Sequence, residues 1–505
     1  MALSAIRRAV WRQLLPDGRS LWQSALAMAL ALALAGVVLL AAVSGSSLKP
    51  AALVLAVMIL PVAAQASGNP RLLLLWCLMF ALPFDLSMYL GPFSSKGGGE
   101  RAFRVELSDV FYGGLLLFQA RDLLRCRWPG LRVPKVILVW LGIMLFWGLD
   151  SVINGPYRTT AAHEIIRMLK MTVLFIVLVN ELDSVGRLRH AAAAITLGMA
   201  FQSCIGILQY LLGHTLGLEF LGELSTKTLD ELSTTSVRDA KVFRIAAFIG
   251  HPNLLGVYLA ACLPLAVCGL MYSSRLLARL FFGVALASGG VALILTQSRS
   301  GWASFAAALL LVMALMVMHQ RLFKRSLSAI AVATVALALL FGAFQEPIMR
   351  RLFSSLEQAA TGREEFKEDA RRLIDEKVML GWGLNQYTLV LPPYMKYTAR
   401  SYSYWIPPVH NIYYLWWAET GLVGLGVHLA MWAAIMLRAC RNLRSHDETL
   451  FLMSLACLGA MVAFAVDGFM SFSLRVNQPQ RVFFVLAAMI YATHYLRQDA
   501  QRVAR

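Results

Sequence analysis

Residues 21–43 read LWQSALAMALALALAGVVLLAAV, a run without a single charged side chain. A helix of about 20 apolar residues is long enough to cross the hydrocarbon core of a bilayer, which is about 30 Å thick. The run follows a basic N-terminal segment and has no small-residue cleavage site that clearly marks a removable signal peptide. We therefore expect it to be the first membrane-spanning helix.

Similar apolar runs recur along the chain, 59% of which is hydrophobic. Soluble domains usually contain about 45–50% apolar residues, and no ten-residue alternation typical of a membrane barrel is present. The sequence therefore predicts an all-α polytopic membrane protein, a single transmembrane domain over residues 1–505 with about 12–14 transmembrane helices. The candidate spans lie near 21–44, 50–67, 71–91, 106–122, 134–153, 159–182, 187–213, 247–273, 279–297, 300–318, 327–346, 410–438, 449–472 and 480–496.

The basic residues predict the orientation of these helices. If the N-terminus is cytoplasmic and the helices alternate, the short basic turns and the C-terminal tail fall on the cytoplasmic side, as the positive-inside rule requires. The formal net charge of +18 then reflects these turns and attraction to anionic partners at a membrane, and we expect no nucleic acid partner. The opposite, outer face receives the longer loops 214–246 and 347–409.

The loop 347–409 contains a segment that is predicted to be an amphipathic helix. Phe366, Ala370, Leu373, Ile374 and Val378 follow one another at helical spacing. The sequence GWG then breaks the pattern. A long ordered loop outside the membrane often carries function, so we expect short helices here to form a cap over the outer face.

His410 opens the apolar helix after this loop, in the sequence PPVHNIYYLWWAETGLVGLG (residues 407–426). Its imidazole titrates near neutral pH and is able to accept a proton from a hydroxyl group. The alternative is an interfacial histidine that anchors the helix end among aromatic side chains, which favour the membrane surface. Both interpretations stay open on the sequence alone.

Several basic residues are predicted on the same face. Arg299 lies in the short outer turn TQSRSGW, where the positive-inside rule does not account for it and a guanidinium suits phosphate binding. Arg167 and Lys170 share one helical face in AAHEIIRMLKMTVLF and are candidates to line an anion-binding cavity. Glu164 lies three residues before Arg167, so an internal salt bridge is the alternative.

Three further residues are candidates with weaker local signals. Arg244 and Arg363 lie near the ends of the outer loops, and either is able to contact an anion or simply be solvated. Asp467 lies within the apolar run FAVDGFMSF and is expected to support a histidine or an arginine, or else to pack between helices. The sequence contains no Asp-x-Asp pair, no zinc-like histidine spacing and no glycine-rich phosphate loop, so we expect no metal and no cofactor. A reaction on a diphosphate would then need arginines to balance the charge of the diphosphate.

Four blocks of the sequence together resemble the O-antigen ligase superfamily. They are RIAAFIGHPNLLGVYLA, LTQSRSGW, TGREEF with the later DEKVMLGWGLNQY, and VHNIYYLWWAETGLVGLG, and they extend over residues 244–426. The resemblance implies a C-type glycosyltransferase-like membrane fold with a helical periplasmic cap, multi-pass in the bacterial inner membrane. The active site would face the periplasm, and both termini would be cytoplasmic.

The resemblance also implies an activity and roles for individual residues. O-antigen ligases transfer O-antigen polysaccharide from undecaprenyl diphosphate to lipid A-core in lipopolysaccharide biosynthesis, so the expected partners are that lipid-linked donor, the lipid A-core acceptor and membrane lipids. His410 corresponds to the catalytic histidine. The diphosphate-binding residues would be Arg299 and Arg363, with Arg244, Arg167 and Lys170, while the supporting residues would be Asn411, Tyr413 and Asp467.

Other functions remain as alternatives. An O-antigen polymerase and a protein O-oligosaccharyltransferase belong to the same superfamily and would share most of these features. A transporter or flippase of lipid-linked glycans would line its pathway with similar charges, although no inverted repeat is visible in the hydropathy.

Overall fold

The computed structural model describes residues 67–84, 86–90, 102–125, 130–219, 222–223, 235–237, 240–319, 356–395 and 408–503, together with the single positions 342, 345 and 349. Most of these residues are helical. The α-helices are α4 (Pro70–Ala81), α5 (Leu107–Leu124), α6 (Lys135–Ile153), α7 (Arg158–Glu181), α8 (Val185–Leu212), α10 (Pro252–Tyr272), α11 (Leu276–Leu295), α12 (Arg299–Met318), α14 (Leu356–Glu376), α15 (Tyr387–Val390), α16 (Ile412–Asn442), α17 (Glu448–Gly468) and α18 (Asn477–Val503). Three short 3₁₀ helices accompany them: η2 (Ala247–Ile249), η3 (Pro392–Tyr394) and η5 (Ser473–Arg475).

Seven helices in the described part of the chain are long and apolar enough to cross a membrane: α6, α8, α10, α11, α12, α16 and α17. The predicted all-α polytopic membrane fold is therefore confirmed. The count of 12–14 spans stays a prediction, since the candidate spans near 21–44, 50–67 and 327–346 fall almost wholly outside the described residues.

One predicted span is wrong in part. The apolar run 71–91 does not form a single helix, because α4 ends at Ala81 and the chain continues into strand β1 (Ser87–Leu90). Pro83 follows directly after the C-cap residue Leu82, and proline has no backbone N–H with which to continue a helix. Strand β1 pairs antiparallel with β2 (Phe103–Glu106), and a second small sheet joins β3 (Thr235–Val237) to β4 (Ala240–Val242).

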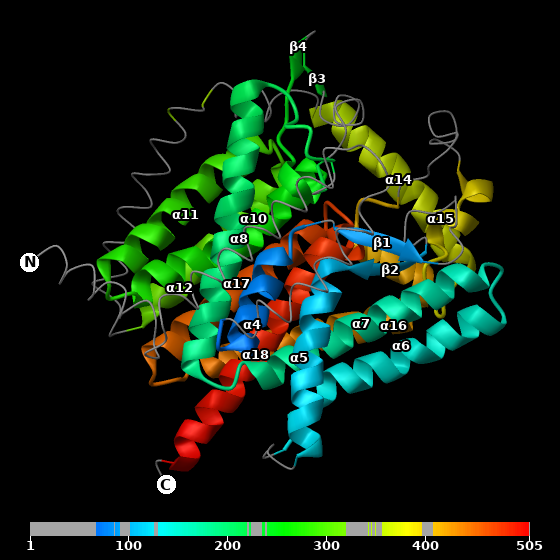
Figure 1. Ribbon diagram of the computed structural model, residues 1–505. Coiled ribbons are helices and arrows are strands. Elements are labelled where there is room, and N and C mark those ends of the chain that lie inside the picture. Colours follow the sequence, from blue (N-terminus) through cyan, green and yellow to red (C-terminus); the bar gives the residue numbers. More distant parts are fainter. Residues whose placement is uncertain are drawn as a thin grey trace, which may run out of the picture.

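The basic turns in the described part of the chain lie at one end of the helix bundle, the end from which α18 leads to the C-terminus in Figure 1. Arg132, which precedes α6, pairs with Asp499 near the end of α18 at 2.6 Å. Arg189 near the start of α8 bonds to Thr449 at the start of α17 and lies over the ring of Tyr272 at the end of α10. We call this the basic end, and we call the opposite end, where α10, α12 and α16 begin, the His410 end.

Helices α10 and α17 form the centre of the bundle. Both are mostly buried, whereas α11 and α12 expose much of their apolar surface. Small residues permit the close packing, as is usual between membrane helices. A Cβ atom added at Gly301 of α12 would lie 3.0 Å from the backbone of Gly256 in α10. The beginnings of α10 and α12 therefore lie side by side.

Helix α14 lies over the His410 end and has the predicted amphipathic pattern. Phe366, Ala370, Leu373 and Ile374 are all buried. Val378 is not part of this face, because α14 ends at Glu376 and the Val378 side chain is 38% exposed.

Candidate functional site

His410 lies immediately before α16, where three distant segments of the chain meet. Asn411 caps the helix, since its side chain accepts hydrogen bonds from the backbone N–H groups of Tyr413 and Tyr414 at 3.0 and 3.1 Å. The His410 ring contacts Phe366 of α14, with 5.7 Å between ring centroids, and Phe472 after α17, at 5.3 Å. The His410 residue remains partly exposed. An imidazole is thus held in place with access from outside the fold.

The other predicted supporting residues connect the start of α16 to the end of α17. The Tyr413 hydroxyl donates to the carbonyl of Ala465 at 2.7 Å. Asp467 is fully buried and accepts a hydrogen bond from the hydroxyl of Ser473. These bonds fix the helix ends that carry His410 and Phe472.

Arg244 joins the beginning of α10 to the turn that carries Arg299. Its guanidinium is buried, donates from Nε to the carbonyl of Thr296 at 2.9 Å, and donates from Nη2 to Asn253 Oδ1 at 2.7 Å. Arg299 is the first residue of α12 and is partly exposed. Gln297, two residues before Arg299 in this turn, has a φ of 50°, which is unusual for a residue other than glycine.

His251 belongs to the same cluster, although the sequence analysis did not single it out. It caps α10, with Nδ1 accepting from the backbone N–H of Asn253 at 3.1 Å. Burial, together with the charges of Arg244 and His410, lowers the pKa of His251 to about 3. This coupling places both residues close to His251. Its place directly before a proline at the first helical position, in GHPN, was the available sequence signal.

Three helices therefore begin around one small region. The N-caps His251, Ser298 and Asn411 start α10, α12 and α16. Unpaired backbone N–H groups and the positive end of the helix dipole favour anions at such positions. With Arg244 and Arg299 added, this region is positively polarised and suited to a phosphate group.

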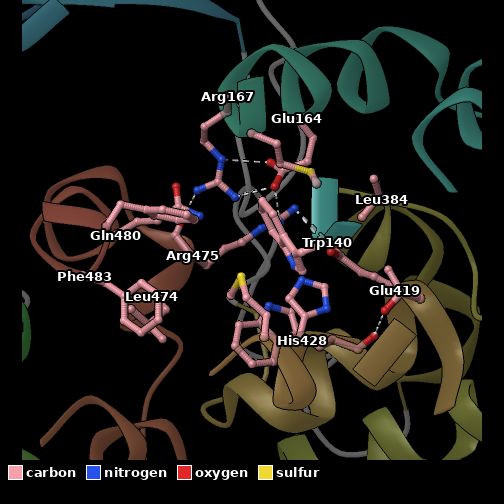
Figure 2. Close-up of a pocket in the computed structure, with 15 residues that line it drawn as sticks. Trp140, Glu164, Arg167, Leu384, Glu419, His428, Leu474, Arg475, Gln480 and Phe483 are labelled. Carbon is pink, nitrogen blue, oxygen red and sulfur yellow. Dashed lines mark hydrogen bonds and ion pairs between the residues drawn. The ribbon is translucent and has the colours of Figure 1, made fainter. Parts of the chain in front are cut away.

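A buried ionic network lies beside this region, around a cavity (Figure 2). Arg167 donates from Nε to Glu164 Oε2 at 3.0 Å and from Nη1 to the carbonyl of Arg475 at 2.8 Å. Arg475 in turn donates from Nη1 to Glu164 Oε1 at 2.8 Å and pairs with Glu419 Oε2 at 3.3 Å. It also bonds to Asn385 Oδ1 at 3.0 Å.

The cavity enclosed by this network has a volume of about 40 Å³ and is also lined by Trp140, Trp416 and His428. That is room for about three water molecules, at roughly 10–15 Å³ each. A sugar or a diphosphate requires much more. In this conformation the network supports the structure around the site rather than receiving a large substrate.

The network lies next to a break in α16, since Glu419 is two residues before Gly421. Gly421 has a φ of 66° and a ψ of −174°, and residues after α14 fill the interruption. The N–H groups of Trp382 and Gly383 donate to the carbonyls of Ala418 and Glu419 at 2.9 and 2.8 Å, while the N–H of Leu422 donates to the carbonyl of Val378 at 2.8 Å. The loop segment 378–383 is thus inserted into a membrane helix, which satisfies the freed backbone groups.

The predicted basic stripe is engaged in internal ion pairs. Arg167 pairs with Glu164, which is the alternative that the sequence offered, and Lys170 pairs with Asp109 and donates to the carbonyl of Arg104. Arg363 lies within α14, but its side chain is outside the described part of the structure. The roles of all three in binding a diphosphate stay predictions. Within the described residues, no group of three or more His, Cys, Asp or Glu side chains is arranged to hold a metal ion.

Comparison with known protein families gives one match. Residues 282–429 match the family model described as O-antigen ligase. No curated protein matches the chain. The matched segment contains Arg299, Arg363 and His410, together with the break in α16, while Arg244 and Arg475 lie outside it. Residues 282–429 are thus similar to the O-antigen ligase family, and the chain is consistent with the O-antigen ligase superfamily of multi-pass membrane proteins.

Proposed function

We propose that this protein is an inverting, metal-independent O-antigen ligase, which transfers O-antigen polysaccharide from undecaprenyl diphosphate to lipid A-core. The observation that carries the proposal is the position of His410. It is partly exposed at the start of α16, within the family-matched region, and it lies near His251, which is also near the buried Arg244. We further propose that the His410 end faces the periplasm of a bacterial inner membrane, as the basic turns at the opposite end suggest.

In the proposed reaction, His410 removes the proton from the acceptor hydroxyl. The acceptor oxygen then forms a bond to the anomeric carbon of the donor, while the bond between that carbon and the diphosphate oxygen breaks. The electron pair leaves with undecaprenyl diphosphate, and a single displacement inverts the anomeric centre. His251, which burial keeps neutral, adds no positive charge that would repel a protonated His410.

The developing negative charge on the diphosphate would be stabilised by Arg299 and Arg363, together with Arg244 and the three helix N-termini. Arg244 is held in place, because Thr296 and Asn253 both accept hydrogen bonds from it. Arg167 and Lys170 are less favoured contacts, since Glu164 and Asp109 already neutralise them.

The test is a transfer assay with purified protein, undecaprenyl-diphosphate-linked glycan, lipid A-core and EDTA. We expect native protein to form product and both His410→Ala and His410→Gln to lose at least about a hundredfold in rate, within the usual contribution of general base catalysis. If folded His410 variants transferred glycan at the native rate, His410 would not be the catalytic base, and it would instead be an interfacial residue that anchors the start of α16. Elongation of a lipid-linked glycan without transfer to lipid A-core would instead identify an O-antigen polymerase.

A further inference from the structure

Helices α16 and α18 bring three arginines together at the basic end of the bundle. Arg438 and Arg441 lie in the last two turns of α16, and Arg497 lies near the end of α18. The charges of all three act on the ring of His494 in α18, so the three guanidinium groups lie around one point. We call these three residues the arginine cluster. The positive-inside rule accounts for basic residues at this end, but it does not require residues of two helices to converge.

Neutral partners hold the arginine cluster in place. Arg438 Nη1 lies 2.9 Å from His494 Nε2. Because a guanidinium group donates hydrogen bonds and cannot accept them, the histidine nitrogen is the acceptor, and the His494 ring is neutral in this arrangement. The Arg438 guanidinium also lies over the Tyr491 ring, with 5.6 Å between its Cζ atom and the ring centroid. Arg497 donates from Nη1 to the backbone carbonyl of Arg441.

The positive charge of the arginine cluster is not neutralised within the fold. Among the described residues, no carboxylate forms an ion pair with Arg438, Arg441 or Arg497. Asp499, two residues after Arg497, pairs with Arg132 at 2.6 Å instead. Arg438 and Arg497 are partly exposed and Arg441 is exposed. A guanidinium group has five N–H donors, so most donors of the cluster are available to an acceptor from outside the fold.

The position of the arginine cluster indicates that this acceptor belongs to a lipid. Helix α16 is one of the candidate membrane spans. Leu437, one turn before Arg441, is 57% exposed, as expected of a residue that faces acyl chains. The last turn of α16 therefore lies at headgroup depth, where the phosphates of the bilayer are found. Basic sites between helices on the cytoplasmic side of a membrane are typical binding sites for anionic headgroups.

We propose that the arginine cluster binds the phosphate of an anionic membrane phospholipid, such as phosphatidylglycerol. The guanidinium groups bind phosphate oxygens through charge-assisted hydrogen bonds. A zwitterionic headgroup such as phosphoethanolamine would place its ammonium group beside three positive charges, so it binds more weakly. Because His410 precedes the first residue of α16 and the cluster lies in its last turns, the lipid site is at the opposite end of this helix from the proposed active site.

The test measures lipid retention by native mass spectrometry of the purified full-length protein, with phosphatidylglycerol and phosphatidylethanolamine supplied separately. The variants are Arg438→Gln and Arg441→Gln. In the described part of the chain, the Arg441 side chain forms no hydrogen bond or ion pair, so Arg441→Gln should fold like the native protein. The matched control is Arg121→Gln in the last turn of α5, because the Arg121 side chain is 51% exposed and lies 3.7 Å from Asp122.

We expect the native protein to retain phosphatidylglycerol better than phosphatidylethanolamine. Arg438→Gln and Arg441→Gln should each weaken the retention of phosphatidylglycerol by about fivefold, the effect of one basic residue near an anionic membrane surface. Both variants should retain phosphatidylethanolamine like the native protein. Arg121→Gln should match the native protein with both lipids, because a neighbouring carboxylate already compensates the charge of Arg121.

Equal retention of the two lipids by the native protein would overturn the proposal, as would an Arg441→Gln variant that retains phosphatidylglycerol like the native protein. An equal loss in Arg121→Gln would also overturn it, because the general positive charge of this end would then attract the lipid. Displacement of phosphatidylglycerol by an equal concentration of inorganic phosphate would show that the ligand is a free anion rather than a lipid. Transfer activity is not the readout, so the outcome is independent of the proposed ligase function.

Discussion

Glu419 and Arg475 form a buried ion pair, with 3.3 Å between Glu419 Oε2 and Arg475 Nη2, at the point where α16 breaks. Both side chains are about 95% or more buried, and Arg475 also bonds to Glu164 and Asn385. One guanidinium thus connects α7, the loop after α14, the broken helix and η5. The architecture around His410 depends on this junction.

Replacing Arg475 should strongly destabilise the protein. Arg475→Met leaves Glu419 buried without its cation, and breaking a buried pair in this way costs about 3–5 kcal/mol. The measurement is the thermal unfolding midpoint in detergent, with Arg371→Gln as the control, because Arg371 forms its ion pairs on the exposed face of α14. A melting temperature of Arg475→Met equal to that of Arg371→Gln would refute the assigned role.

Gly421→Ala should release the inserted loop segment. The backbone angles of Gly421 are accessible almost only to glycine, and an added Cβ atom would lie 2.1 Å from the carbonyl oxygen of Met379. We expect hydrogen exchange at Trp382 and Gly383, whose N–H groups donate to α16, to become faster. Gly426→Ala is the matched control in the same helix, since a Cβ there meets nothing within 4 Å. It should leave exchange unchanged and stabilise the helix by up to about 1 kcal/mol.

Acid should destabilise the native protein through His251. Its folded pKa of about 3 is far below the ordinary value near 6.5. The unfolded chain therefore binds a proton that the folded one excludes, and stability present above pH 6.5 is lost as the pH falls toward 3. Between pH 7.5 and pH 5 this loss amounts to about 2 kcal/mol. His251→Asn, which can still cap α10, should show a smaller fall in melting temperature over this interval.

The His251→Asn variant also tests which of the two histidines, His251 or His410, causes the pH dependence of activity. Because His251 does not titrate between pH 5 and 8, an acid limb in the pH profile of kcat/KM should persist in His251→Asn. The proposed mechanism assigns that limb to His410. If the limb disappears in His251→Asn while the protein stays folded, His251 rather than His410 is the titrating group.

Gly301→Ala should reduce the transfer rate, although it adds only a methyl group and alters no polar side chain. The new Cβ atom would lie 3.0 Å from the backbone of Gly256, so the starts of α10 and α12 must separate. That movement shifts Arg299 relative to Arg244, and small displacements of positioned groups cost between about tenfold and a hundredfold in rate. Gly283→Ala in α11 is the control, because its Cβ meets no atom within 4 Å. Equal transfer rates for the two variants would show that this packing does not position the arginines.

Local pattern predicted the elements and part of the site. The spacing of Phe366, Ala370 and Leu373 identified the buried face of α14, and the position of His410 before an apolar run identified a helix N-terminus. These features depend on neighbours within a few residues, which a sequence displays directly. Strand β1 was missed because three of its four residues, Met88, Tyr89 and Leu90, are apolar and continue a hydrophobic run.

The ionic network was not predictable in the same way. Glu419 and Arg475 are 56 positions apart, and Glu164 is 311 positions from Arg475. Glu419 and Arg475 appear in the sequence as isolated charges near apolar segments, and the sequence analysis singled out neither of them. The partner of each buried charge depends on how the helices pack against one another. The sequence of one helix does not show which other helix packs against it. Arg167 shows the difference, since its local partner Glu164 was a stated alternative and its distant contact with Arg475 was not.

The inserted segment 378–383 also imposes an order on biosynthesis. It leaves the ribosome before α16, yet its acceptors Ala418 and Glu419 belong to that later helix. The segment must therefore wait until α16 has entered the bilayer. Between the entry of α16 and the docking of this segment, α16 carries unpaired backbone groups at its break, at a cost of several kcal/mol for each group in lipid. A chain that stalls at this stage exposes backbone groups that the finished protein pairs.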